Sequence, residues 1–393
     1  MQMKRFVCIL MLVVAALPAW CAKKITVAEL SDMLKAMHEQ KKSDTDVAAA
    51  LKQVQLSELL SRSKMNEFGA FAPGPLTTEQ IYVLEARSAT LPPPAGELPS
   101  TPAPDAAGQK AILDKAAAYA SKTWAQLPAI SATKTTLRFQ DNVEAAAPSS
   151  GIAGSGREVT VGSFVSPLQF VHYINSTEST YSSDHGVERL PDDKTRWGAN
   201  KMIAIREPDP SPANVFQDAQ TGGTITWLRW ENLNGKTAAV FAFQVPKKKS
   251  HINANVCCFP NVDQTGMSRI STSSIAGIAG GSPDAGGNFQ TATDWHNFKS
   301  NGVPYHGEFF IDPDTGIVVR MITQLELKQT DVVHQQDTRI DYGPVKVGDK
   351  ELVLPMKTVI ATEVVPNGDS QAAGKFSTRA TLFTIEYKNY QLK

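Results

Sequence analysis

The sequence predicts an α+β protein, in which an N-terminal helical region is followed by a large curved antiparallel sheet, an unclosed barrel, that packs on a helix. Hydrophobic residues recur at helical spacing up to about residue 127, and from Ile130 onward the period is about two. Short turn signals in the second half indicate consecutive antiparallel strands. The predicted divisions are a signal peptide, a helical region, a proline-rich linker and a helix-plus-sheet domain, at 1–22, 23–90, 91–104 and 105–393.

Residues 1–22 have the layout of a secretory signal peptide. Two basic residues at 4–5 precede an apolar run, 6–17, that is too short to span a bilayer. Trp20 stands before Cys21, where the signals of lipid-anchored proteins have a small residue, so a lipid anchor at Cys21 is disfavoured. We therefore expect a periplasmic or secreted protein that has no transmembrane segment after processing, with peripheral membrane contact left open.

The charge balance and the cysteine content limit the kinds of partner and the redox chemistry that the sequence allows. Lysine plus arginine and aspartate plus glutamate number 39 each, so no net charge attracts nucleic acid, and no nucleic-acid partner is expected. After processing, cysteine remains only at Cys257 and Cys258. Adjacent α-carbons lie about 3.8 Å apart, closer than the roughly 4.4 Å at which disulfide geometry begins. The pair is therefore either a strained redox bridge or two thiols, one or both buried in a strand.

The mature N-terminal part is helical by its local signals. The letters TVAE at 26–29 have the spacing of a capping box, in which threonine and glutamate satisfy free amide donors at a helix start. Hydrophobic residues then fall on one helical face. Further helices are expected at 46–54, 56–68 and 78–87. We hypothesise that this small bundle binds an envelope protein partner.

A proline-rich stretch separates this bundle from the rest. Residues 91–104 read LPPPAGELPSTPAP, where proline removes amide donors and fixes φ, so the stretch is expected to be a stiff linker. One more helix, at 105–127, carries an apolar stripe and ends before Pro128. The sheet is expected to wrap over this helix.

The clearest hairpin is 224–245, because Asn234-Gly235 is the preferred two-residue turn with positive φ. Folding about this turn predicts three pairs on one apolar face: Trp230 with Ala239, Leu228 with Phe241 and Thr226 with Phe243. Arg229 and Glu231 then lie on the opposite face.

A second hairpin is predicted at 305–327, around the turn letters DPDTG. Phe310 and Val319 fall on one of its faces and Ile311 and Val318 on the other, which predicts a central hairpin covered on both sides. Further strands are expected at 332–342, 351–363 and 376–390, joined by short polar turns as an antiparallel meander.

The order of parts resembles the periplasmic lipoprotein-carrier superfamily, LolA-like and LolB-like. The resemblance rests on the strand patterns YHGEFFIDPDTGIVVRM and IDYGPVKVGDKELVLPMKTVI and covers about residues 105–393. A further likeness is to exported bacterial proteins with the segment VPKKKSH…CC at 245–258. The resemblance implies an unclosed barrel with helices over an apolar cavity for acyl chains, and it assigns no individual site residue.

Sequence motifs for common enzymes are missing. The chain has no serine-hydrolase elbow, no zinc-protease motif, no P-loop and no dinucleotide fingerprint. A cysteine nucleophile at Cys257 or Cys258 would need an imidazole from His251, His296 or His306. We favour separate histidines, and expect no enzyme, no cofactor and no metal.

The candidate ligand site is instead apolar. The one-sided hairpin offers a binding wall made of Trp227, Leu228, Trp230, Phe241 and Phe243. Packing against the 105–127 helix explains the same residues. The leading hypothesis is therefore an exported, non-enzymatic protein that shelters a lipid or lipoprotein acyl chain. The alternatives are a structural or interaction protein with a filled core and a cysteine-dependent redox protein.

Overall fold

The computed structural model describes residues 23–141, 171–189, 204–205, 211–233, 235–260, 295–328, 333–364 and 380–393. The predicted signal peptide, with Cys21, lies outside them. The α-helices in these residues are α1 Val27–Glu39, α2 Asp44–Leu51, α3 Arg62–Gly69, α4 Pro75–Arg87, α5 Ala106–Ala118 and α6 Pro212–Gly222. The strands are β1 Lys23–Ile25, β2 Val54–Leu56, β3 Ile130–Gln140, β4 His172–Asp184, β5 Val187–Glu188, β6 Ala204–Ile205, β7 Thr224–Leu233, β8 Lys236–Val245, β9 Ala254–Pro260, β10 Trp295–Ser300, β11 Tyr305–Ile311, β12 Val318–Leu325, β13 Val333–Val347, β14 Lys350–Val364 and β15 Ala380–Leu392.

The predicted helical region has a core of its own. The capping box at Thr26 is confirmed, because its side chain accepts from the Glu29 amide while Glu29 accepts from the Thr26 amide. Buried residues of α1 to α4 pack into one cluster, with Leu30 and Leu34 fully buried. The predicted end of one helix at Val54 and start of the next at Leu56 were wrong: Val54–Leu56 form β2, which pairs in parallel with β1, and the next helix, α3, begins at Arg62.

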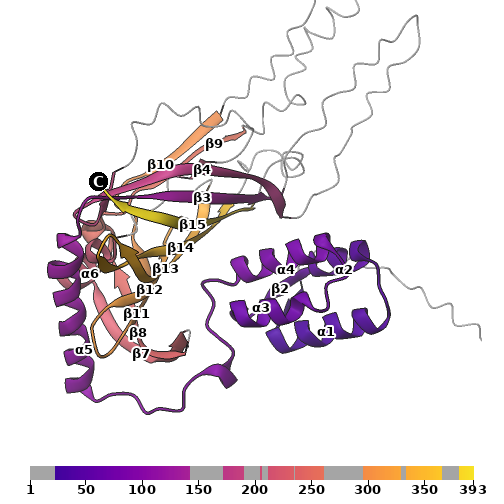
Figure 1. The fold of residues 1–393 in the computed structure, drawn as a ribbon, viewed down its shortest axis with the longest axis horizontal. Helices are drawn as coiled ribbons and strands as arrows, with labels where there is room; N and C mark the ends of the chain where they lie inside the picture. The colour runs from indigo at the N-terminus through magenta and orange to yellow at the C-terminus, as the bar shows by residue number, and fades with distance from the viewer. Residues whose placement is uncertain are drawn as a thin grey trace, which may run out of the picture.

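A large antiparallel sheet that does not close is confirmed. Its ten strands run in the order β5-β4-β3-β15-β14-β13-β12-β11-β8-β7, and β11 to β15 form the predicted meander. The second hairpin, β11–β12, lies between β8 and β13, and is therefore central as predicted. Figure 1 shows this sheet between α5 and α6 on one side and α1 to α4 on the other.

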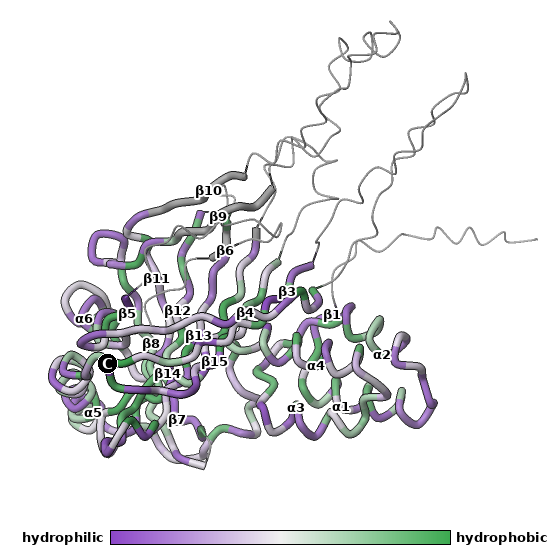
Figure 2. Tube along the Cα trace, turned by 45° about the horizontal axis from the view of Figure 1, so that its top comes forward, coloured by the Kyte–Doolittle hydropathy of each residue, from purple (hydrophilic) through white to green (hydrophobic). Residues whose placement is uncertain are grey.

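We call the side under α5 and α6 the inner face. Its hydrophobic cluster joins residues of these helices, such as Ala116 and Phe216, to aromatic residues of the strands, such as Phe309. The predicted helix at 105–127 is α5, continued by a π turn, Tyr119–Thr123, and a 3₁₀ turn, Trp124–Gln126. Figure 2 shows the apolar stretches of the strands gathered beside α5.

The opposite side, which we call the outer face, has two smaller apolar clusters. Val83, Ala86 and Ala89 at the end of α4 pack on Val359 and Leu382 of β14 and β15. A second cluster, around Phe310 and Ile322, lies on the strands nearer β7. The helical region therefore covers the outer face over β14 and β15.

Two β-bulges shift the predicted register. In β7 the pairing moves between Trp227 and Arg229, so Trp227, and not Leu228, lies opposite Phe241. Beyond the bulge Ile225 faces Phe243, whereas the predicted pair of Trp230 with Ala239 is confirmed.

The second bulge lies between Phe310 and Ile311 and skips Val319 in β12, yet both predicted apolar faces of this hairpin are present.

Candidate functional site

The predicted aromatic wall is part of the inner core. Phe241 is fully buried, and Phe243 lies with its ring centroid 4.3 Å from that of Phe309. Trp227 contacts Trp230 and Phe241 edge to face, with centroid distances of 4.8 and 5.3 Å. The bulge turns both tryptophans to the inner face. Four of the five predicted wall residues are therefore in one cluster.

Leu228 is separated from this cluster. It is the extra residue of the β7 bulge, and 44% of it is exposed. Phe241 and Phe243 are buried in the cluster to which α6 contributes Phe216, whose ring centroid lies 5.1 Å from that of Phe309. Trp227 and Trp230 are partly buried, and the Trp230 indole donates to the carbonyl of Pro102 in the linker at 2.8 Å. Hydrocarbon can reach Phe241 and Phe243 only if α5 and α6 move off the sheet.

The cysteines lie in β9, which belongs to a three-stranded sheet with β6 and β10. Cys257 is the backbone partner of both Asn297 and Ala204, and the register shift beside Asn297 leaves Cys258 as a bulge residue. The structure does not describe their side chains. Of the histidines considered as bases, His251 is bound through Nδ1 to Asp218 at 2.6 Å, and Asp218 also accepts from the Tyr305 hydroxyl.

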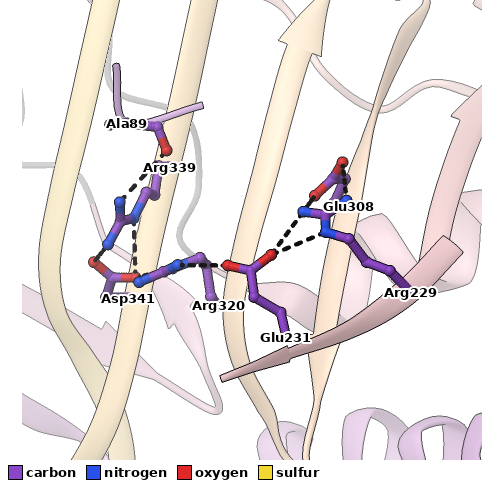
Figure 3. Close-up of polar contacts among 7 residues, drawn as sticks. All are labelled: Ala89, Arg229, Glu231, Glu308, Arg320, Arg339 and Asp341. Atoms are coloured by element: carbon purple, nitrogen blue, oxygen red, sulfur yellow. Dashed lines mark hydrogen bonds and ion pairs between the residues drawn. The ribbon is translucent and has the colours of Figure 1, made fainter. Parts of the chain in front are cut away.

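The outer face carries a set of buried and partly buried ion pairs between residues of β7, β11, β12 and β13, which we call the charge ladder (Figure 3). Its members are Arg229, Glu231, Glu308, Arg320, Arg339 and Asp341. Arg229 forms two-pronged contacts with Glu231 and Glu308, each with a closest distance of 2.8 Å. Arg320 lies between two carboxylates, with Nη1 3.7 Å from a Glu231 oxygen and Nε 2.6 Å from an Asp341 oxygen. Arg339 holds the other Asp341 oxygen at 2.9 Å.

Charge pairing offsets the cost of burying the ladder. Burial alone would raise the pKa of Asp341, but Arg320 and Arg339 outweigh it and hold this pKa well below the usual range. Burial likewise opposes the charged form of Arg229, whereas Glu308 and Glu231 raise its pKa. The guanidinium groups of Arg229 and Arg320 lie 5.8 and 5.3 Å from the centre of the Phe310 ring. The ladder thus lies on the part of the outer face that α4 does not cover.

One end of the ladder meets the helical region. Arg339 donates to the Ala89 carbonyl at 3.4 Å, and Lys357 of β14 binds the buried Glu85 carboxylate at 3.0 Å. The Tyr82 hydroxyl lies 2.7 Å from that of Thr384. Polar and charged contacts of this kind are typical of interfaces between domains that retain some freedom of motion.

A cleft of about 190 Å³ opens at this contact, and we call it the junction cleft. Its helical wall includes Lys24, Gln55 and Arg87, and its sheet wall includes Gln324, Gln335 and Asp337. Ligand sites often lie at such interfaces.

The residues of the junction cleft come from segments about 300 positions apart, so local pattern reasoning missed them. For the charge ladder a signal was present in the sequence: Arg339 and Asp341, like Arg229 and Glu231, place opposite charges two positions apart on one strand face.

The described residues contain no helix that is long and apolar enough to cross a bilayer, and no group of three metal-binding side chains among histidine, cysteine, aspartate and glutamate. No protein-family model, curated protein or solved structure matches the chain. The resemblance to lipoprotein carriers therefore stays a prediction from sequence.

Proposed function

We propose that this protein is an exported, non-enzymatic binding protein whose ligand lies in the junction cleft. The observation that carries the proposal is the contrast between the two faces of the sheet. The inner face is packed with α5, α6 and the aromatic cluster, whereas the outer face has a cleft whose walls carry both polar and apolar side chains from two separately packed parts of the chain.

The size and lining of the cleft indicate the kind of ligand. Pockets for drug-sized molecules measure about 300 to 1,000 Å³, and this one measures about 190 Å³. It therefore suits one small polar molecule. A ligand touching both walls would hold the helical region on the sheet and so raise the stability of the whole chain, because binding to the folded state alone shifts the folding equilibrium.

The test is a thermal-shift screen of the purified chain with amino acids, monosaccharides, inorganic phosphate and a fatty acid. We expect a saturable rise in Tm with one polar class. Gln55 is exposed on the cleft wall, so Gln55→Trp should fill the cleft and remove the shift. Gln53→Trp, at an exposed position outside the lining, is the matched control. The proposal fails if no polar class shifts Tm, or if Gln55→Trp binds as the original chain does.

Carriage of an acyl chain is the second candidate. Trp227 and Trp230 stay partly exposed on the edge strand β7, beside the exposed Leu228. An acyl chain entering there would displace α5 and α6 from the aromatic cluster. Native mass spectrometry after gentle purification should then reveal lipid adducts that Trp230→Ala weakens and Gln55→Trp leaves unchanged. Repeated absence of adducts would argue against carriage.

Export has its own test. Sequencing the N-terminus of the protein recovered outside the cytoplasm should give a mature start just after Cys21 or Ala22. Recovery of the intact N-terminus, or of an acylated Cys21, would contradict this part of the proposal.

A further inference from the structure

Asp337 stands apart from the other buried and partly buried acids of the outer face. Glu231, Asp341 and Glu85 each bind an arginine or lysine. Asp337 is only 5% exposed, and its Oδ2 accepts hydrogen bonds from the amide nitrogens of Gln335 at 2.5 Å and Gln324 at 3.3 Å. Among the described residues, no lysine or arginine lies within ion-pair distance of it.

Burying the Asp337 carboxylate in this way lowers the stability of the folded chain when no ligand is bound. Burial raises the pKa of Asp337, and the two amides and the more distant His306 oppose this only in part, while Glu363 adds to it. A buried carboxylate that lacks a cation weakens the fold, and residues of this kind are concentrated at functional sites. Asp337 lies on the wall of the junction cleft, where a ligand can supply the missing cation.

The opposite wall carries the complementary charge. Lys24 and Arg87 line the cleft from the helical region, and both are exposed. The sheet wall thus has two acids, the buried Asp337 and the exposed Glu363, and the helical wall has two basic groups. This distribution matches a small molecule that has an ammonium group at one end and a carboxylate at the other.

We propose that the junction cleft binds a free α-amino acid, with its ammonium group on Asp337 and its carboxylate toward Lys24 and Arg87. The inference rests on the proposed function and names its ligand class. A cleft of about 190 Å³ accommodates one such molecule. The two glutamines fix the carboxylate of Asp337 before the ligand arrives, so little ordering is needed on binding.

The test uses isothermal titration and thermal shift with glycine, alanine, serine, glutamate and lysine, together with the N-acetyl and amide derivatives of whichever binds. We expect acetylation, which removes the ammonium group, and amidation, which removes the carboxylate, each to weaken binding at least tenfold. Asp337→Asn should weaken binding at least tenfold as well. Asp349→Asn, with the same charge change in an exposed turn, should not.

Stability separates a binding role for Asp337 from a structural one. The raised folded pKa means that the contribution of Asp337 is most favourable below its unfolded pKa, near about 4, and is lost as pH rises through the folded value. Asparagine stays neutral and still accepts a hydrogen bond. Asp337→Asn without ligand should therefore melt higher than the original chain at pH 7.5, and the two should converge near pH 4. A purely structural carboxylate predicts a lower Tm at pH 7.5.

A second variant covers the case in which Asp337→Asn does not fold. Lys24→Met with Arg87→Met changes only exposed positions, and should weaken binding of the free amino acid more than binding of its amide. Unchanged affinity in both variants, or equal binding of the N-acetyl derivative, overturns the inference. If a sugar or phosphate binds and Gln55→Trp blocks it, the inference fails and the proposed function stands; if nothing binds, both fail.

Discussion

Replacing Asp341 with asparagine removes one negative charge from the middle of the charge ladder. The carboxylate accepts from Arg320 Nε at 2.6 Å and from Arg339 Nε and Nη2 at 3.1 and 2.9 Å. The side chains of both arginines are about nine-tenths buried, with 10% and 12% exposed. The variant therefore leaves two neighbouring guanidinium groups with one uncharged acceptor between them.

The expected cost follows from the contacts that remain. Arg320 keeps Glu231 at 3.7 Å, and Arg339 keeps the Ala89 carbonyl at 3.4 Å, so neither arginine is left entirely without a partner. Breaking a buried ion pair on one side costs about 3 to 5 kcal/mol. We expect Asp341→Asn to lower the free energy of unfolding by about 3 kcal/mol at pH 7, measured by urea denaturation followed through tryptophan fluorescence.

The pH dependence gives a second check on this prediction. Because the folded pKa of Asp341 is depressed, its contribution is fully present above the unfolded pKa of about 4 and is lost as pH falls toward the folded value. The difference between the original chain and Asp341→Asn should therefore shrink as pH drops below 4. A cost below about 1 kcal/mol at pH 7, or a difference that grows toward acid pH, would refute the reasoning.

Two further variants test the junction and the inner core. Lys357→Met leaves the buried Glu85 carboxylate without its cation and should lower the free energy of unfolding by about 3 kcal/mol. Limited proteolysis should also cut the linker at 91–104 faster in this variant. The control Lys388→Met removes a lysine from an exposed pair and should change neither the stability nor the rate of proteolysis. Phe241→Ala should lower the free energy of unfolding by about 3 to 5 kcal/mol in urea denaturation. Leu228→Ala should have little effect because Leu228 lies outside the core. Equal losses of stability in the two variants would contradict the assignment of Phe241 to the core and Leu228 to the surface.

Local rules account for what the sequence predicted well. The capping box at Thr26 and Glu29 needs only residues three apart, and the Asn234-Gly235 turn needs only a positive φ, which Gly235 adopts at 82°. The meander β11 to β15 follows because short polar turns leave antiparallel pairing with the next strand as the nearest solution. These signals are complete within a few residues, so composition and spacing are sufficient to find them.

The predictions from sequence were wrong where one extra residue in a strand changes the register, and where a short strand depends on a distant partner. The bulge at Leu228 moves it out of the predicted wall and makes Trp227 the partner of Phe241 in its place, because skipping one residue reverses which side chains face inward. The sequence placed Val54 and Leu56 in the ends of two predicted helices, because the three residues of β2 carry no period of their own and depend on pairing with β1.

The α+β class, the open meander and the apolar hairpin were determined by the sequence itself, through propensities and periods that act over neighbouring residues. Only the tertiary structure decided which charges meet. Glu85 binds Lys357 because α4 docks on the outer face, and Asp337 accepts from two glutamines of the sheet and, in the part of the chain that the structure describes, pairs with no lysine or arginine. Ion pairing depends on distance and burial in space, and neither is encoded in local spacing.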